Sequence, residues 1–214
     1  MAEKIQVLQV NKQFKNEMVL HDINIKFEEG KIHGIIGKNG SGKTVLLKII
    51  CGLLKPTSGK VLVDGKEVGK DIDYPDNMGI IIEAPGFLPY SSGYKNLEYL
   101  ASLKKIIGKE DIERAMRKVG LDPAIKKGVG KYSLGMKQRL GLAQAIMENP
   151  DILILDEPMN GLDKQGVEET RSLFSELRDQ GKTILLVSHS GEDISSLCDT
   201  VCEMDRGNLT QLSV

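Results

Sequence analysis

The stretch GKNGSGKT, Gly37–Thr44, limits what this chain can fold into more than any other part of its sequence. It fits the pattern G-x-x-x-x-G-K-[ST], follows a short β-branched run, Ile32–Ile36, and leads into an apolar segment that predicts a helix from about Lys43 to Leu54. A strand, a glycine-rich turn and a helix in this order direct backbone N–H groups and a helix N-terminus at a polyphosphate. An ordinary glycine-rich turn is the alternative, which this context disfavours. We therefore expect a phosphate-binding loop.

Each residue type in this phosphate loop has a physical role. Glycines let successive N–H groups turn toward the phosphates. Lys43 is expected to reach the β- and γ-phosphates, and the hydroxyl of Thr44 is expected to bind Mg²⁺. The predicted nucleotide-binding residues of the loop are Gly37, Asn39, Gly40, Ser41, Gly42, Lys43 and Thr44.

A second stretch, NPDILILDEP at 149–158, is a continuous apolar run that ends in two acids. Such a run predicts a fully buried strand of a parallel sheet. Ligands bind at the carboxyl edge of open parallel sheets, so Asp156 and Glu157 are expected beside the phosphate loop. Asp156 would hold Mg²⁺ through water, and Glu157 would polarise the attacking water in phosphoryl transfer. Two acids that merely begin a loop are the alternative.

His189 ends another apolar run, ILLVSHS at 184–190. A lone histidine is more often structural than catalytic. This one is expected at the same sheet edge as Asp156 and Glu157, where it could donate a hydrogen bond to a γ-phosphate. The predicted catalytic residues are thus Lys43, Glu157 and His189.

Strand-like and helix-like segments alternate along most of the chain, which predicts an α/β fold with a largely parallel sheet. Alternating residues at 4–9 and 22–27 predict a small β-layer. Helical spacing dominates from Ser91 to Val119. Further elements are expected at Lys60–Asp64, Gly79–Ile82 and Thr183–Ser188 as strands, and at about Lys164–Asp179 as a helix. We expect one domain, 1–214, in which a helical block from about 84 to 134 is inserted between core strands.

The charge balance and the apolar pattern exclude several classes of protein. Basic residues number 29 and acidic residues 30, which argues against a partner nucleic acid bound through a basic surface. No run approaches a membrane-spanning length, and MAEKIQVLQV at the N-terminus lacks a signal-peptide pattern. Cys198 and Cys202 would share a face on a helix, and we expect buried thiols in a reducing, cytoplasmic setting.

The order of these motifs resembles that of the ATP-binding subunits of ABC transporters over nearly the whole chain. The phosphate loop corresponds to the family's Walker A motif, Ile152–Asp156 to its Walker B strand, and His189 to its switch histidine. The segment NGLD, Asn160–Asp163, corresponds to the D-loop. The resemblance implies a P-loop NTPase core with a mostly parallel sheet, an N-terminal antiparallel β-subdomain and an inserted α-helical subdomain.

The segment YSLGM, Tyr132–Met136, resembles the family signature usually written LSGGQ and keeps Ser133 and Gly135. In this family two domains sandwich two ATP molecules head to tail, and each ATP contacts Walker A of one chain and the signature of the other. The resemblance therefore implies that Ser133, Gly135 and Met136 contact ATP held by a second copy or a paralogous subunit, at a helix N-terminus that favours anions. It also implies that Asp163 couples the two sites.

The same resemblance implies a partner and a location. Closing around ATP and opening after hydrolysis would drive a polytopic membrane permease, with this chain peripheral on the cytoplasmic face of the cell membrane. The segment PGFLPYSSGYKNL at 85–97 is rich in apolar residues for a loop, so Phe87, Leu88 and Tyr90 are either permease-docking residues or core.

Two departures from the family pattern point to one branch of it. Glu83 stands where the family has the glutamine of its Q-loop, a residue that contacts Mg²⁺, and Leu134 and Met136 depart from the signature. Both features are similar to those of bacitracin-resistance and lantibiotic-immunity ATPases. The predicted metal-binding residues are Thr44, Glu83 and Asp156. A carboxylate near the γ-phosphate should make the site more dependent on Mg²⁺; an exposed loop acid is the alternative for Glu83.

Phe14 matches the family position whose aromatic ring stacks on adenine. A stacked ring supplies affinity with little base discrimination, so other purine triphosphates are expected to bind too. Packing of the ring between strands is the alternative.

Other functions remain open from the sequence alone. A soluble ATPase of the same family that acts without a permease is the main alternative, and an ordinary P-loop kinase is disfavoured by YSLGM. The branch resemblance favours export of a peptide antibiotic or a related hydrophobic molecule. Because the chain ends at Val214, soon after the last strands, we expect no C-terminal regulatory domain of the kind found in some importers.

Overall fold

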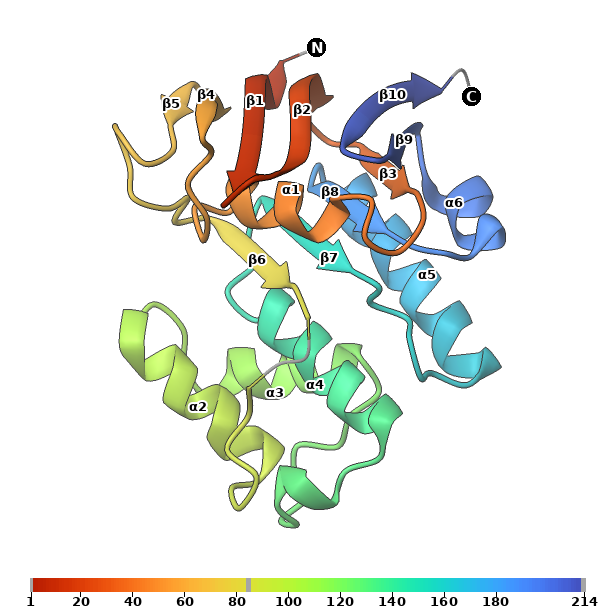
Figure 1. The fold of residues 1–214 in the computed structure, drawn as a ribbon. Coiled ribbons are helices and arrows are strands. Elements are labelled where there is room, and N and C mark those ends of the chain that lie inside the picture. The colour runs from red at the N-terminus through yellow and green to blue at the C-terminus, as the bar shows by residue number, and fades with distance from the viewer. Residues whose placement is uncertain (1, 84–85, 213–214) are drawn as a thin grey trace.

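Two β-sheets and the helices packed on them make up the computed structural model, which describes residues 2–83 and 86–212 (Figure 1). An antiparallel sheet has the strand order β2-β1-β4-β5, and a six-stranded sheet has the order β10-β9-β3-β8-β7-β6. In the second sheet all neighbouring strands are parallel except β10 with β9. The predicted α/β fold, with a mostly parallel core sheet and an N-terminal antiparallel layer, is therefore confirmed.

The bounds of the strands follow from the sequence patterns. The antiparallel sheet consists of β1 (Glu3–Phe14), β2 (Glu17–Glu28), β4 (Ser58–Val63) and β5 (Lys66–Glu67). The larger sheet consists of β3 (Ile32–Ile36), β6 (Met78–Ile81), β7 (Ile152–Asp156), β8 (Thr183–Val187), β9 (Thr200–Asp205) and β10 (Asn208–Leu212).

Six α-helices and one short 3₁₀ helix lie within the described residues. They are α1 (Lys43–Ile50), α2 (Gly93–Lys104), α3 (Lys109–Lys118), η1 (Val129–Lys131), α4 (Leu134–Ile146), α5 (Lys164–Asp179) and α6 (Gly191–Leu197). Between β6 and β7 the chain forms α2, α3, η1 and α4, which lie together below the sheets in Figure 1.

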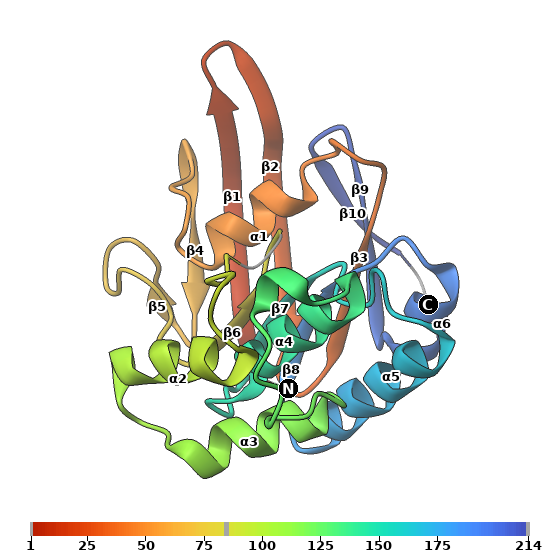
Figure 2. The same cartoon turned by 90° about the horizontal axis from the view of Figure 1, so that it is seen from below.

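The core strand β7 is buried on both faces, as its continuous apolar run requires. Ile152 and Ile154 belong to the cluster that joins α1 to the antiparallel sheet, whereas Leu153 and Leu155 belong to the cluster that includes α4 and α5. Helix α1 accordingly lies between the two sheets (Figure 2). This arrangement holds the ends of β3, β7 and β8 at one edge of the sheet, next to the phosphate loop.

One local expectation was wrong. Helix α1 ends at Ile50 rather than near Leu54, because Gly52 adopts the left-handed conformation at φ +77° and stops the helix. Cys198 is the C-cap of α6 and Cys202 lies in β9, so the two cysteines are not on one helix; Cys202 is buried, as expected, and Cys198 is half-buried. All three thiols are free, and burial raises the pKa of Cys51 to about 12 and that of Cys202 to about 11.

His33 is buried in β3 with both ring nitrogens paired. Nε2 lies 2.9 Å from the carbonyl oxygen of Glu28, and Nδ1 lies 2.7 Å from the hydroxyl of Thr200. A carbonyl can only accept, so Nε2 donates to Glu28, and Nδ1 accepts from Thr200 in the neutral ring. Burial lowers the pKa of His33, so the folded protein keeps the ring neutral at mildly acidic pH.

We expect the free energy of unfolding to fall as the pH drops below about 6.5, because the unfolded chain then binds a proton that folded His33 does not. The contribution is complete above about pH 6.5 and is lost at up to about 1.4 kcal/mol per pH unit as the pH approaches the lowered folded value. Chemical denaturation of His33→Gln between about pH 7.5 and 5.5 should give a flatter pH dependence than wild type. His21→Gln, at an exposed position, is the control. Equal slopes in wild type and His33→Gln would contradict the assignment.

None of the described helices combines the length and apolarity that crossing a membrane requires.

Candidate active site

The phosphate loop takes the shape that its glycines permit. Gly37, Gly40 and Gly42 all have positive φ, at +143°, +76° and +112°. A Cβ atom on Gly37 would collide with the carbonyl oxygen of Met204, so only glycine fits there. Gly42 is the N-cap of α1 and makes no side-chain cap, so the first N–H groups of α1 stay available to an anion.

Lys43 lies inside the curve of this loop, although it is the first residue of a helix. Its Nζ donates to the carbonyl oxygens of Gly37, at 2.6 Å, and Lys38, at 3.0 Å. The side chain is buried, and burial lowers the pKa of Lys43, while the carboxylates of Asp156 and Glu157 oppose that shift. The ammonium is thus held among oxygen atoms, where a phosphate group would replace carbonyl partners.

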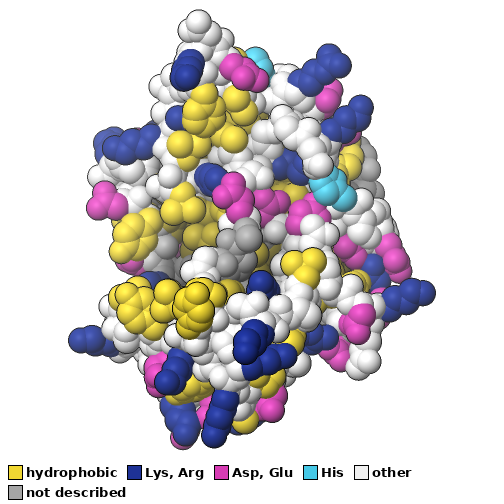
Figure 3. Space-filling model, turned by 60° about the horizontal axis from the view of Figure 1, so that its bottom comes forward, with side chains coloured by type: hydrophobic (Ala, Val, Ile, Leu, Met, Phe, Trp, Pro, Cys, Tyr) yellow, Lys and Arg dark blue, Asp and Glu magenta, His cyan; other side chains and the backbone are white. Residues whose placement is uncertain are grey.

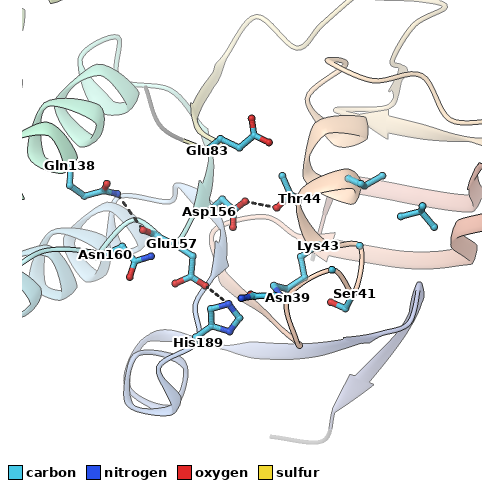
Figure 4. A pocket seen from close by; sticks show the side chains of 14 residues that line it. Asn39, Ser41, Lys43, Thr44, Glu83, Gln138, Asp156, Glu157, Asn160 and His189 are labelled. Atoms are coloured by element: carbon cyan, nitrogen blue, oxygen red, sulfur yellow. Dashed lines mark hydrogen bonds and ion pairs between the residues drawn. The ribbon is translucent and has the colours of Figure 1, made fainter. Parts of the chain in front are cut away.

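Thr44 and Asp156 meet although they are far apart in sequence. Thr44 Oγ1 donates to Asp156 Oδ2 at 2.7 Å, because α1 starts beside the carboxyl end of β7 (Figure 4). No group of three or more His, Cys, Asp or Glu residues among those described could hold a metal by itself. Mg²⁺ at nucleotide sites takes one or two protein oxygens together with phosphate oxygens and water. A hydroxyl and a carboxylate side by side fit that requirement.

Glu157 follows β7 in a strained backbone conformation, with φ +51°. Its N–H donates to the carbonyl oxygen of Val187 at 3.0 Å, which ties it to β8. Oε1 is buried and has no hydrogen bond to the described residues, although His189 Nε2 lies 3.2 Å away at ion-pair distance. Burial raises the pKa of Glu157, and His189 and Lys43 counteract the shift. A buried carboxylate oxygen aimed into a cavity suits a group that accepts a proton or orients water.

The turn that carries His189 is fixed by a buried hydrogen-bond network. Ser188 Oγ donates to Asp193 Oδ2 at 2.9 Å and accepts from the N–H of Ser190 at 3.1 Å. Asp193 in turn accepts from Arg171 Nη2 at 2.6 Å and Nε at 2.9 Å. His189 itself is exposed at the rim, so its backbone is held while its ring can reach a ligand.

A single cavity of about 650 Å³ unites most of the residues predicted from sequence. That volume lies in the range of small-ligand sites. The predicted residues that line it are Asn39, Gly40, Ser41, Gly42, Lys43, Thr44, Glu83, Asp156, Glu157 and His189 (Figure 4). Ser41 Oγ is buried there without a hydrogen-bond partner among the described residues, so it is free to serve a ligand. Gly37 lies behind the lining and shapes the loop.

Four lining residues were missed by the sequence analysis: Val19, Val45, Gln138 and Asn160. Val19 and Val45 have no pattern that distinguishes them from other apolar residues. Asn160 belongs to the D-loop segment, and its polar side chain so close to Glu157 was an available indication. Gln138 lies one turn into α4, and its amide Nε2 donates to the carbonyl oxygens of Pro158, at 2.8 Å, and Glu157, at 3.3 Å.

Glu83 lies on the rim of the cavity, in the left-handed conformation at φ +61°. Its Oε1 accepts from Lys48 Nζ of α1 at 2.7 Å, and its side chain is 64% exposed. The pair crosses between the end of β6 and α1, so Lys48 neutralises part of the charge that Glu83 brings to the site. Its contact with Mg²⁺ stays a prediction.

The signature residues do not line this cavity. Ser133 is the exposed N-cap of α4, and its Oγ accepts from the N–H of Met136 at 3.2 Å, with Gly135 between them in the first turn. Asp163 is the exposed N-cap of α5 and accepts from the N–H of Gly166 at 2.9 Å. The starts of both helices are thus exposed and lie outside the lining of the cavity.

Phe14 also lies outside the cavity lining. It ends β1, at the tip of the long β1–β2 hairpin that projects in Figure 2. The ring is 44% exposed, and Lys12 Nζ lies 4.8 Å from its centroid, over one face. It does not pack between strands, which removes the alternative raised for it. Stacking on adenine stays a prediction.

Comparison with known proteins agrees with the motif order. The family described as ABC transporter matches residues 20–160. The chain is 45% identical to an uncharacterised ABC transporter ATP-binding protein, YybJ, of Bacillus subtilis, over 96% of this chain and 94% of the relative. It is 41% identical to the bacitracin transport ATP-binding protein BcrA of Enterococcus faecalis, over 97% of this chain and 68% of that protein.

A solved structure shares the fold. The dimeric ATP-binding cassette MJ0796, in a post-hydrolysis state bound to ADP and Pi, superposes with a TM-score of 0.87 over 98% of this chain and 99% of that one, at 23% identity.

Proposed function

The chain belongs to the ABC transporter family, and from that premise we propose that it binds and hydrolyses ATP as the nucleotide-binding subunit of a transporter. The observation that carries the proposal is the convergence in one cavity of the phosphate loop, the Thr44–Asp156 pair and the half-buried carboxylate of Glu157. These groups come from two stretches far apart in sequence, Gly37–Thr44 and Asp156–Glu157. A structural role would not require a buried carboxylate oxygen that has no hydrogen bond to the described residues and lines the same cavity as an anion-binding loop.

Each residue has a part in hydrolysis. N–H groups of the phosphate loop and the ammonium of Lys43 bind the β- and γ-phosphates and stabilise the charge of the transferred group. Glu157 orients and polarises the attacking water, and His189 donates to a γ-phosphate oxygen. Thr44 and Asp156 would hold Mg²⁺, with Glu83 at its edge; the ion supplies charge neutralisation on the phosphates. Phe14 stacks on adenine.

Two copies, or this chain and a paralogous subunit, complete each other's sites. Ser133 is exposed at the start of α4, outside the chain's own cavity, and Gly135 follows it in the first turn, which suits contact with ATP bound to a partner. Met136 is half-buried and packs against the core cluster, so its N–H is the group that would face the partner's ATP. Asp163 lies at the start of α5 on the same kind of outward helix end and couples the two sites. ATP then joins the subunits, and hydrolysis releases them.

The motion is passed to a polytopic membrane permease, with the chain peripheral on the cytoplasmic face of the membrane. The whole chain, 1–214, acts as one ATP-binding domain in which 84–134 is the inserted helical part that meets the permease. Leu88 and Tyr90 are exposed, whereas Phe87 packs against the core cluster, so two of the three predicted docking residues are available. Hydrophobic side chains gather beside the hollow that crosses this face (Figure 3).

One relative with a named cargo is a bacitracin transport ATP-binding protein. We infer export of a peptide antibiotic or a related hydrophobic molecule, a substrate that the permease would select.

The test is to purify tagged protein from detergent-solubilised membranes and to measure ATP hydrolysis with and without candidate peptides. A co-purifying polytopic membrane protein and peptide-stimulated turnover are expected. Full ATP turnover with no membrane protein bound would favour the alternative, a soluble ATPase of the same family. Absence of ATP binding by folded protein would refute both.

Glu83 predicts an unusual dependence on metal. We expect half-maximal ATP turnover of Glu83→Gln at a higher Mg²⁺ concentration than wild type, by roughly two- to threefold, because the variant loses a negative charge that attracts the ion to the site. Titrating Mg²⁺ at fixed ATP measures the shift. Glu148→Gln is the control, because it removes one carboxylate, which pairs with Lys104 Nζ at 2.9 Å and does not line the cavity. Equal Mg²⁺ dependence in wild type and Glu83→Gln would show that the charge does not act on the metal.

A further inference from the structure

The first turns of α4 are fastened to the segment that follows β7. Gln138 Nε2 donates to the carbonyl oxygens of Glu157 and Pro158, so one side chain of the signature helix holds two consecutive peptide groups beside the buried carboxylate. Figure 4 shows Gln138 reaching from α4 to this point. Among the described residues it is the side chain of α4 that lines the cavity.

The peptide that Gln138 holds needs external support. Glu157 has φ +51°, a conformation that costs a residue with a Cβ on the order of 1–2 kcal/mol. Its N–H is fixed by Val187, and its carbonyl oxygen accepts from the N–H of Asn160 at 3.2 Å in addition to Gln138. Strain of this kind persists only where the surroundings hold it, so the amide of Gln138 helps to fix the direction in which the carboxylate of Glu157 points.

A second contact ties the signature to the same segment. Leu134, one of the departures from the family pattern, covers Gly161 of the D-loop so closely that a Cβ on Gly161 would lie 2.5 Å from Leu134 Cδ2. A Cβ on Gly135 would lie 2.9 Å from the carbonyl oxygen of Gly161. Residues 157–161 are therefore held against α4 by hydrogen bonds at one point and by close packing one turn earlier.

We propose that Gln138 is a positioning residue that links two ATP sites through one chain. It connects Glu157, which serves the site of its own chain, to the helix start at Ser133, which serves the site of the partner. The inference rests on the proposed head-to-tail function. When the partner's ATP binds or leaves, the start of α4 shifts, and the amide of Gln138 passes this shift to the backbone of Glu157. ATP hydrolysis at the two sites is therefore coupled.

The test measures dimer formation rather than ATP turnover. A variant that affects only the hydrolysis step would leave dimer formation unchanged. The full-length Glu157→Gln variant is expected to form dimers in the presence of ATP and Mg²⁺. Sedimentation velocity measures the fraction of dimer. Adding Gln138→Met, which keeps the length of the side chain but removes the donor, should raise the ATP concentration for half-maximal dimerisation about tenfold, the loss expected for two neutral hydrogen bonds. In the otherwise wild-type chain, Gln138→Met should lower kcat with little change in KM for ATP.

A matched control is available on the same helix. Gln144 has no side-chain hydrogen bond to the residues that the structure describes, so Gln144→Met should leave dimerisation unchanged. Gln138→Asn keeps the amide but cannot reach both carbonyls; it replaces the methionine variant if that fails to fold, with a smaller shift in the same direction.

The outcomes separate two failures. If Glu157→Gln forms no dimer with ATP, the proposed head-to-tail function is wrong, and the link between sites with it. If it dimerises and Gln138→Met, or Gln138→Asn in its place, leaves the ATP dependence unaltered, only the role of Gln138 is overturned.

Discussion

Glu157→Gln should abolish nearly all ATP turnover and leave ATP binding intact. A positioned general base contributes roughly 10²–10⁴-fold to a rate, so kcat should fall by at least two orders of magnitude. The amide has nearly the shape of the carboxylate, so the backbone bond to Val187 and the contact with His189 remain possible. With hydrolysis blocked, the ATP that joins two subunits persists, and the variant should accumulate as a dimer in the presence of ATP and Mg²⁺.

The pH dependence gives an independent check on the same residue. Burial raises the pKa of Glu157, and a base works only when deprotonated, so turnover of the wild type should decline on the acid side at a higher pH than an exposed glutamate would cause. The residual turnover of Glu157→Gln should lack that acid limb. Glu168→Gln, on the exposed face of α5, controls for loss of one carboxylate. Wild-type kcat in Glu157→Gln would remove Glu157 from the mechanism.

The ends of the predicted helices and strands were accurate where an apolar run stops at the end of the element. The resemblance to the Walker B motif implied the strand Ile152–Asp156, and the helix was predicted at about Lys164–Asp179; the structure has both with these bounds, and Asp163 caps the helix. The end of α1 was missed because Leu53 and Leu54 continue the apolar pattern beyond Gly52, yet Leu53 is 62% exposed. A backbone conformation at one glycine overrode hydrophobic periodicity there.

Some contacts of the candidate site could also be predicted from the sequence, and others could not. Residues at strand ends could be predicted to converge, because parallel strands deliver their carboxyl ends to one edge; Asp156, Glu157 and His189 do so. The Lys48–Glu83 pair and the bonds from Gln138 could not be predicted, because they depend on how α1 and α4 rotate about their own axes when packed on the sheet. Such contacts between distant segments leave no spacing in the sequence.

Lys43→Ala should weaken ATP binding by on the order of 10²-fold, the equivalent of one or two hydrogen bonds to a charged group. The ammonium is the buried cation of the phosphate loop, already desolvated and placed between Gly37 and the carboxylates of β7. Turnover at saturating ATP should fall as well, since the same charge stabilises the transferred phosphoryl group. Isothermal titration with ATP, made on protein whose fold is checked by thermal unfolding, measures the affinity directly.

We expect the loss of ATP affinity in Lys43→Ala to depend on the position of the ammonium and not only on its charge. Lys38, in the same loop, is exposed, and its side chain makes no hydrogen bond or ion pair with the described residues. Lys38→Ala removes one positive charge a few residues away, yet screening by water should limit its effect on affinity to about threefold. Lys43→Ala and Glu157→Gln then fail in different ways: the first loses the complex, the second keeps the complex and loses the reaction. If Lys38→Ala and Lys43→Ala lowered the affinity for ATP equally, the loop would attract ATP through its overall charge. Lys43 would then make no specific contact with a phosphate group.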